Sequence, residues 1–120
     1  MDSGISAQLT VRAEVLRARY RSRLPSTLDD LGGPDRGIVD LPLHVVWSGR
    51  TSFALDRPKA QMSLYRAVLA EGQHNDLTMF LNRRLLLEQW PVLRRLISPY
   101  IREAWENAFP ELARTASAAA

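Results

Sequence analysis

The sequence predicts a single α+β domain that is mostly α-helical, and three observations lead to this fold class. Apolar residues recur every three or four positions near the N-terminus and again from residue 57 onward, which is the spacing of one helix face. Two short apolar runs within residues 41–55 flank a glycine, a pattern typical of a β-hairpin. Proline and asparagine interrupt the later helical stretch, so the helices there must be short. We therefore expect an N-terminal amphipathic helix, a small β-hairpin and four or five short packed helices.

Composition divides the chain of 120 residues into four segments. Residues 1–24 form the expected basic helix, and residues 25–40 form a linker rich in glycine, proline and aspartate, with little to bury. Residues 41–112 hold the hairpin and the helical domain, and residues 113–120 are expected to be a disordered, alanine-rich tail. The chain has no cysteine, so thiolate metal sites and disulfides are excluded, and a core of this size does not require them.

The N-terminal helix is expected from Ser6 to Leu24, and residues 1–24 account for the whole net positive charge of the chain. Residues 1–24 contain five arginines against two acidic residues, and the net charge of the full sequence is +3. Arginine side chains surround the polar side of the helix and could bind nucleic-acid phosphates with a salt-dependent affinity. The candidate nucleic-acid-binding residues are Arg12, Arg17, Arg19, Arg21 and Arg23. The alternative is a solvated helix whose arginines pair with the linker acids Asp29, Asp30, Asp35 and Asp40.

The hairpin is expected to pair residues 41–47 with residues 51–55. A three-residue loop places Trp47 opposite Thr51 and Val45 opposite Phe53, whereas a two-residue loop places Trp47 opposite Ser52. Either register leaves more apolar surface than one side of a two-stranded ribbon can cover, and an open strand edge can dock another chain. The candidate protein-binding residues are Leu43, Val45, Trp47 and Phe53. Self-association through the same edge and a fully covered ribbon are the alternatives.

The helical half is expected to contain helices at 57–71, 76–81, 83–90, 91–97 and 99–108. A break near Asn82 avoids burying Arg83 and Arg84 without partners, and Pro91 and Pro99 each mark a helix start. We expect Asn75 or Asp76 to cap the second of these helices, and Arg102 to pair with Glu106 one turn away in the last. One alternative is a helix-turn-helix in which Arg94, Arg95 or Arg102 reaches the bases of DNA. A short-helix core around Trp90, Trp105 and Phe109 is the simpler interpretation.

The side chains that carry catalysis are few and scattered in the sequence. The two histidines, His44 and His74, lie in different elements without metal-ligand spacing, and we expect His44 on the solvent side of a strand. We therefore expect no enzyme activity, no metal and no cofactor. An enzyme would require a pocket that brings His44 or His74 against a carboxylate. The longest apolar run is far shorter than the ~20 residues that span a bilayer, so a cytoplasmic location without a membrane span is expected.

Short apolar and aromatic stretches recur through residues 41–112: Leu41-Pro42-Leu43, Trp47-Ser48-Gly49-Arg50, Phe53-Ala54-Leu55-Asp56, Leu64-Tyr65, Val68-Leu69-Ala70-Glu71-Gly72, Asp76-Leu77, Phe80-Leu81-Asn82, Trp90-Pro91, Trp105-Glu106 and Phe109-Pro110-Glu111-Leu112. In these stretches, residues 41–112 resemble a group of small bacterial regulatory or antitoxin-like proteins. The resemblance implies a non-catalytic accessory protein whose partner is a nucleotidyltransferase-type toxin encoded nearby. The sequence thus predicts a protein-interaction module, with a DNA-binding transcriptional regulator as the alternative.

Overall fold

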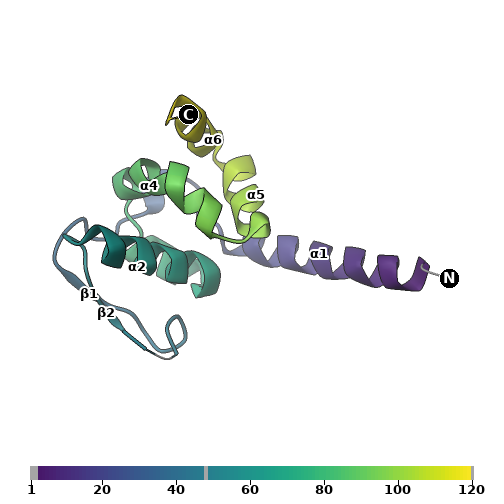
Figure 1. The fold of residues 1–120 in the computed structure, drawn as a ribbon, viewed down its shortest axis with the longest axis horizontal. Helices are drawn as coiled ribbons and strands as arrows, with labels where there is room; N and C mark the ends of the chain where they lie inside the picture. The colour runs from purple at the N-terminus through teal and green to yellow at the C-terminus, as the bar shows by residue number, and fades with distance from the viewer. Residues whose placement is uncertain (1–2, 48, 120) are drawn as a thin grey trace.

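The computed structural model describes the backbone of residues 3–47 and 49–119, and the side chains of residues 7–47 and 49–118. Its described part is mostly helical with one antiparallel pair of strands, which confirms the predicted fold class. Figure 1 shows α1 extending away from a body that the other elements form. The elements in chain order are α1 Ser3–Arg23, the 3₁₀ helix η1 Leu28–Asp30, β1 Ile38–Asp40, β2 Ser52–Ala54, α2 Pro58–Glu71, α3 His74–Phe80, α4 Arg83–Leu96, α5 Pro99–Ala108 and α6 Pro110–Ala119.

Helix α2 lies at the centre of the body, with the hairpin on one side and α4 on the other (Figure 1). Its apolar residues recur at helical spacing, so Leu64, Tyr65 and Val68 all become fully buried. Trp90 of α4 and Trp105 of α5 fill the other half of the same core. The predicted helix at 57–71 is confirmed, with Pro58 in its first turn.

Glycine is required at position 72, where α2 ends, because a side chain would not fit there, and not because the backbone adopts a left-handed conformation. The φ of Gly72 is −71°, which any residue adopts, but a Cβ there would lie 2.5 Å from the Val68 carbonyl oxygen. Only glycine therefore allows the chain to turn so closely against the last turn of the helix.

The prediction that residues 25–40 form a linker with little to bury is wrong. Leu28 and Leu31 are almost completely buried, and the backbone N–H of Gly33 donates to the Leu81 carbonyl oxygen at 2.9 Å. The N–H of Gly32 donates to the Thr78 carbonyl oxygen at 2.9 Å, so the segment is bonded to the end of α3. The segment has the glycine-rich composition of a mobile linker. Here, however, glycine lets two backbone segments approach closely, so the segment is ordered.

The hairpin forms, but its first strand lies before the predicted one and its register differs. Val39 pairs with Phe53, and the ladder continues through the N–H of Leu41 to the Thr51 carbonyl oxygen at 2.9 Å. Residues 41–47, predicted as a strand, instead turn at Pro42, whose carbonyl oxygen accepts from the N–H of Val45 at 3.0 Å. The observed register is favoured because it buries Val39 opposite Phe53, against α2.

The predicted break near Asn82 is confirmed, whereas the predicted helix start at Pro91 is wrong. The Asn82 side chain caps α4 by accepting from the Leu85 N–H at 3.2 Å. Pro91 lies inside α4, where it removes one backbone donor. The helix continues because Trp90 and Leu93 extend the buried face of Leu86, and burying these side chains outweighs one lost hydrogen bond.

Asp76 stabilises the start of α3 from its third position and not as the residue that precedes the helix. Its carboxylate accepts from the N–H of Gln73, the N-cap residue, at 2.8 Å. The prediction that Asn75 or Asp76 is the cap residue is therefore wrong by two or three positions, because the helix begins at His74.

Two further predictions for the C-terminal region are also wrong. Glu106 pairs with Arg94 of α4 at 2.8 Å, and Arg102 instead donates to the Arg94 carbonyl oxygen at 3.1 Å. The tail predicted to be disordered is helical through Ala119, because alanine is the best helix former and Leu112 and Ala116 attach α6 to the core. Residue 120 lies outside the described residues.

Candidate functional site

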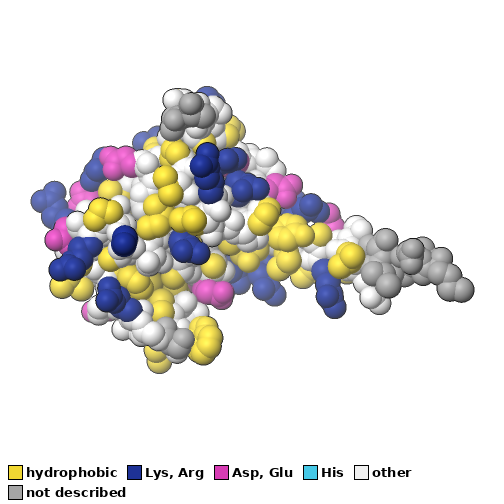
Figure 2. All heavy atoms as spheres, in the orientation of Figure 1, with side chains coloured by type: hydrophobic (Ala, Val, Ile, Leu, Met, Phe, Trp, Pro, Cys, Tyr) yellow, Lys and Arg dark blue, Asp and Glu magenta, His cyan; other side chains and the backbone are white. Residues whose placement is uncertain are grey.

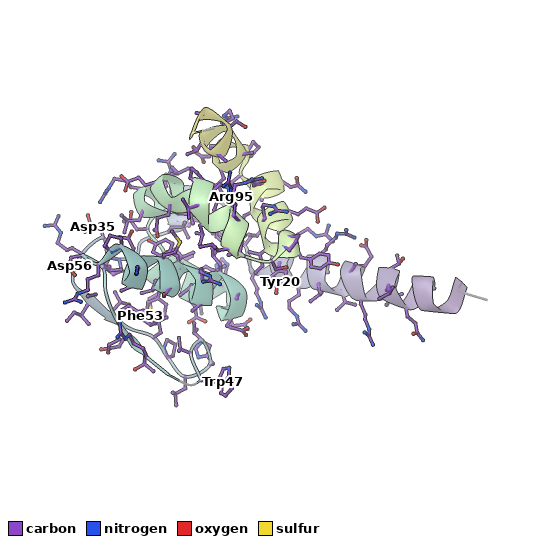
Figure 3. The ribbon with its side chains drawn as sticks, viewed as in Figure 1. Tyr20, Asp35, Trp47, Phe53, Asp56 and Arg95 are labelled. Carbon is purple, nitrogen blue, oxygen red and sulfur yellow. The ribbon has the colours of Figure 1, made fainter. Side chains whose placement is uncertain are left out.

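The hairpin presents two of its four predicted protein-binding residues to solvent and buries the other two. Trp47 is 82% exposed and Leu43 is 71% exposed, whereas Val45 and Phe53 are part of the core. Figure 3 shows Phe53 beside α2 and Trp47 at the end of the loop, away from the body. The alternation of side chains between the two faces of a strand could not predict this division, because residues 41–47 do not form a strand.

The loop that carries Trp47 is anchored on both sides of Leu43 and on the N-terminal side of Trp47. Leu41 and Val45 are buried, and the N–H of Val46 also donates to the Pro42 carbonyl oxygen, at 3.1 Å. We call the exposed part, Leu43 with Trp47 and the half-buried Val46, the loop tip. Tryptophan is highly buried on average in folded proteins, so an 82% exposed one on an anchored loop marks a candidate contact surface.

Two of the five predicted nucleic-acid-binding arginines are engaged within the fold. Arg17 pairs with Glu103 of α5 at 3.1 Å and with Glu14 at 3.0 Å, and its guanidinium lies over the Tyr100 ring. The hydrogen bond to Glu103 raises the pKa of Arg17 above its ordinary value. Arg23 lies over the Tyr20 ring at 5.8 Å.

The other three arginines of α1 remain accessible. Arg12, Arg19 and Arg21 are exposed, and none of them forms an ion pair with any described residue. The alternative that α1 pairs with the linker acids is wrong for the described side chains. Asp29 pairs with Arg83 at 3.3 Å, and Asp35 pairs with Arg36 and Arg84. Asp40 accepts instead from the hydroxyl of Ser52 in the hairpin.

A second set of exposed cations lies on α2 and was not identified from the sequence. Lys59 and Arg66 are seven positions apart, with Ser63 between them, so all three share one exposed face of the helix. Arg50 and Lys59 line a groove of about 310 Å³. Arg66 and Tyr20 line a second groove of about 370 Å³, and Ser63 lines both. The spacing of Lys59 and Arg66 was a signal for this face, but only the fold brings Tyr20 beside it.

The structure brings His44, but not His74, into contact with a carboxylate. The Nε2 atom of His44 lies 2.7 Å from an oxygen of Asp76, which is 8% exposed. The expectation that His44 belongs to a strand is wrong, since it lies in the loop after β1, whereas its expected exposure to solvent is confirmed. His74 lies near the Arg23 carbonyl oxygen, at 3.2 Å from its Nδ1 atom.

The His44 contact has a clear role in holding the fold together. The same Asp76 carboxylate oxygen also accepts from the Gln73 N–H, so it joins the loop of the hairpin to the start of α3. Neither His44 nor Asp76 lines any of the grooves described above. Within residues 7–47 and 49–118, no three metal-ligating side chains of the His, Cys, Asp and Glu type come together.

The helix-turn-helix alternative places its arginines mostly in internal contacts. Arg94 pairs with Glu106, which also accepts from the Trp90 indole N–H at 2.8 Å. The hydrogen bond from Arg94 holds the pKa of Glu106 below its ordinary value. Arg102 donates to the Arg94 carbonyl oxygen, and Arg95 is exposed (Figure 3). Of the three, only Arg95 is accessible in the manner that base recognition requires.

Comparison with known proteins gives no relative from which a role could be transferred. No protein-family model, curated protein or solved structure matches this chain. None of the described helices is both long enough and apolar enough to cross a membrane.

Proposed function

We propose that this chain is a non-catalytic binding protein that docks a protein partner through the loop tip. The observation that carries the proposal is the 82% exposure of Trp47, two positions after the buried Val45. An anchored loop loses little conformational freedom on binding, so most of the gain from burying the indole is retained as affinity.

The size of the expected gain follows from the area of the exposed side chains. An aromatic side chain buries roughly 150–250 Å², and apolar area contributes about 25 cal/mol per Å². Because Trp47 is 82% exposed, burying the rest of it contributes up to about 5 kcal/mol, within the range of interface hot spots. A tryptophan that anchors an interface fits an apolar pocket in the partner.

Charge near the loop tip indicates the chemistry of the partner. Arg50, three residues after Trp47, is exposed and forms no ion pair with the described residues. We infer a partner with an apolar pocket bordered by acidic side chains. The resemblance to antitoxin-like proteins supports testing the product of the neighbouring gene first, as a candidate toxin. We assign His44 and Asp76 a structural role, because their contact holds this loop against α3.

The experiment measures the affinity of the purified neighbouring gene product for wild-type and variant chains. Trp47→Ala should weaken binding at least 30-fold, equivalent to a hot-spot contribution of about 2 kcal/mol. The matched control is Val92→Ala, because Val92 is an exposed apolar residue of α4, and it should leave the affinity unchanged. Thermal melting should show both variants to be as stable as the wild type.

A photo-crosslinking amino acid at position 43, with Trp47 kept, provides a second readout. It should crosslink the chain to the acidic partner, and the crosslink should be lost when Trp47→Ala is added. Crosslinking of a second copy of this chain would instead establish self-association and overturn the proposal. Equal effects of Trp47→Ala and Val92→Ala on affinity would overturn it as well.

A further inference from the structure

A row of arginines follows one face of α1 and ends beside α2. Arg12, Arg19 and Arg23 are separated by seven and four positions, which places them on the same side of the helix. Arg23 reaches the carbonyl oxygen of Ala70, the penultimate residue of α2, at 3.5 Å. The C-terminal end of this row therefore lies against the C-terminal end of α2.

The cations of α2 continue the row from the point where the two helices meet. Arg66 precedes Ala70 by one helical turn, and Lys59 lies two turns earlier on the same exposed face. Arg50 extends the set from the hairpin loop, since it lines one groove together with Lys59. We call this set the basic track: Arg12, Arg19, Arg23, Arg66, Lys59 and Arg50.

The cations of the basic track lack acidic partners among the described residues, as do five arginines outside it: Arg21, Arg57, Arg95, Arg102 and Arg114. Within the described residues, none of its six cations forms an ion pair. Arg17, Arg83, Arg84 and Arg94, by contrast, are all paired with carboxylates. The net charge of +3 thus understates the local field, because the acidic side chains neutralise arginines elsewhere. Figure 2 shows dark blue side chains over the face that carries α2 and α4, with yellow ones between them.

The length of the basic track selects a polymeric anion. Eleven residues separate Arg12 from Arg23, which is about 16 Å along a helix, and seven residues separate Lys59 from Arg66, about 10 Å more. A single phosphate or nucleotide can contact only a small part of such a row. Guanidinium groups bind phosphate oxygens through two parallel hydrogen bonds, so a chain of phosphates matches the arginine-rich composition of the track.

A groove at the middle of the basic track adds a surface for a base. Tyr20 and Arg66 line this groove of about 370 Å³, together with Ala67, Ile97 and Ser98. An aromatic ring and an arginine beside an apolar floor resemble the stacking surfaces that hold unpaired bases in single-strand-binding proteins. A base in a duplex is stacked on its neighbours and cannot enter such a groove without being extruded.

We propose that the basic track binds single-stranded nucleic acid, with its phosphates on the cations and one base at Tyr20. This inference goes beyond the proposed docking of a protein partner and shares only Arg50 with it, so either proposal can fail while the other holds. The loop-tip variant Trp47→Ala should leave the affinity for nucleic acid unchanged.

The test is fluorescence anisotropy of a labelled 20-nucleotide single strand with the full chain. Arg23 is held by the Ala70 carbonyl oxygen and the Tyr20 ring, so five cations of the track remain for phosphates. Five phosphate contacts predict a slope of log affinity against log salt near −3.5, so affinity should fall about 100-fold between 50 and 200 mM salt. Arg19→Gln combined with Arg66→Gln should weaken binding about tenfold and reduce the slope by about 1.4. Neither residue is buried, so the double variant should remain folded by circular dichroism.

Charge-matched and ligand controls separate the proposal from general attraction between opposite charges. Arg36→Gln combined with Arg114→Gln removes the same charge outside the track and should change affinity less than twofold. A duplex of equal length should bind more weakly than the single strand, and polyglutamate should not compete at equal charge. Absence of binding at 50 mM salt, equal loss in both double variants, or tighter binding of the duplex or polyglutamate would overturn the proposal.

Discussion

Replacing Gly33 by alanine should destabilise the fold strongly, although the sequence around it has the composition of a mobile linker. A Cβ at this position would lie 2.5 Å from the carbonyl carbon of Phe80, 2.6 Å from its oxygen and 2.8 Å from the Leu81 nitrogen. All three atoms belong to the backbone, so no side-chain rotation can relieve the contact. The segment must move away from the junction between α3 and α4.

The expected magnitude combines strain with lost hydrogen bonds. Moving the segment breaks the Gly33 N–H bond to the Leu81 carbonyl oxygen and the bond from the Asn82 side chain to the Gly33 carbonyl oxygen. Each contributes about 1 kcal/mol, and overpacking of this kind costs about 1–3 kcal/mol. We expect a loss of about 4 kcal/mol, which for 120 residues lowers Tm by about 15 °C.

The adjacent glycine supplies a matched control. A Cβ at Gly32 would lie 3.9 Å from the Thr78 carbonyl oxygen, which is ordinary contact, and its φ is not positive. Gly32→Ala should therefore change stability by less than about 1 kcal/mol, because the alanine also restricts the unfolded chain.

Urea unfolding followed by far-ultraviolet circular dichroism measures both variants at neutral pH. Equal stabilities for Gly32→Ala and Gly33→Ala would show that residues 25–37 do not pack as described, and would refute the reasoning. A free energy of unfolding for Gly33→Ala within about 1 kcal/mol of the wild-type value would also refute the reasoning.

Three other predictions concern the contacts that hold the helices together. Glu106→Gln should cost about 2 kcal/mol at pH 7, since it removes a charged acceptor from Arg94. Folding lowers the pKa of Glu106, so this stabilisation is present above the ordinary glutamate pKa of 4.5 and is lost as pH falls through the lowered pKa. The unfolding curves of wild type and variant should therefore converge at acidic pH. Burial raises the pKa of Tyr65 to about 12, so as pH rises the tyrosine ionises first in the unfolded chain, and the free energy of unfolding should fall by about 2 kcal/mol between pH 10 and 12. The urea midpoint of Tyr65→Phe should fall less over this range, and an equal fall would contradict this cause. Asn82→Ala should lower Tm by about 6 °C because it removes the cap of α4 and the bond to Gly33, whereas Asn75→Ala on the exposed side of α3 should not.

Local signals account for the parts of the fold that the sequence predicted correctly. Helix α2, the helix break near Asn82 and helix α5 starting at Pro99 each depend on residues within a few positions of one another. Capping and apolar spacing act over this range, so the chain alone contains the information. The mostly helical fold class follows from the same signals.

The errors arise where contacts between distant residues decide the outcome. Pro91 ends a helix in isolation, but the buried face that includes Trp90 keeps α4 continuous. Glu106 has Arg102 one turn away, yet it pairs with Arg94 because α4 crosses α5 at that point. Local spacing contains neither fact.

The candidate surfaces divide in the same way. The apolar character of residues 41–47 and the arginines of α1 were visible in the sequence, whereas the separation of exposed Trp47 from buried Val45 required the turn at Pro42. The basic track required the fold as well, because Arg23 and Arg66 belong to helices that only packing brings together. The sequence by itself thus determined which residues could form helices and which charges were available. The tertiary structure decided which side chains face solvent together, because burial is shared among segments that are far apart in the chain.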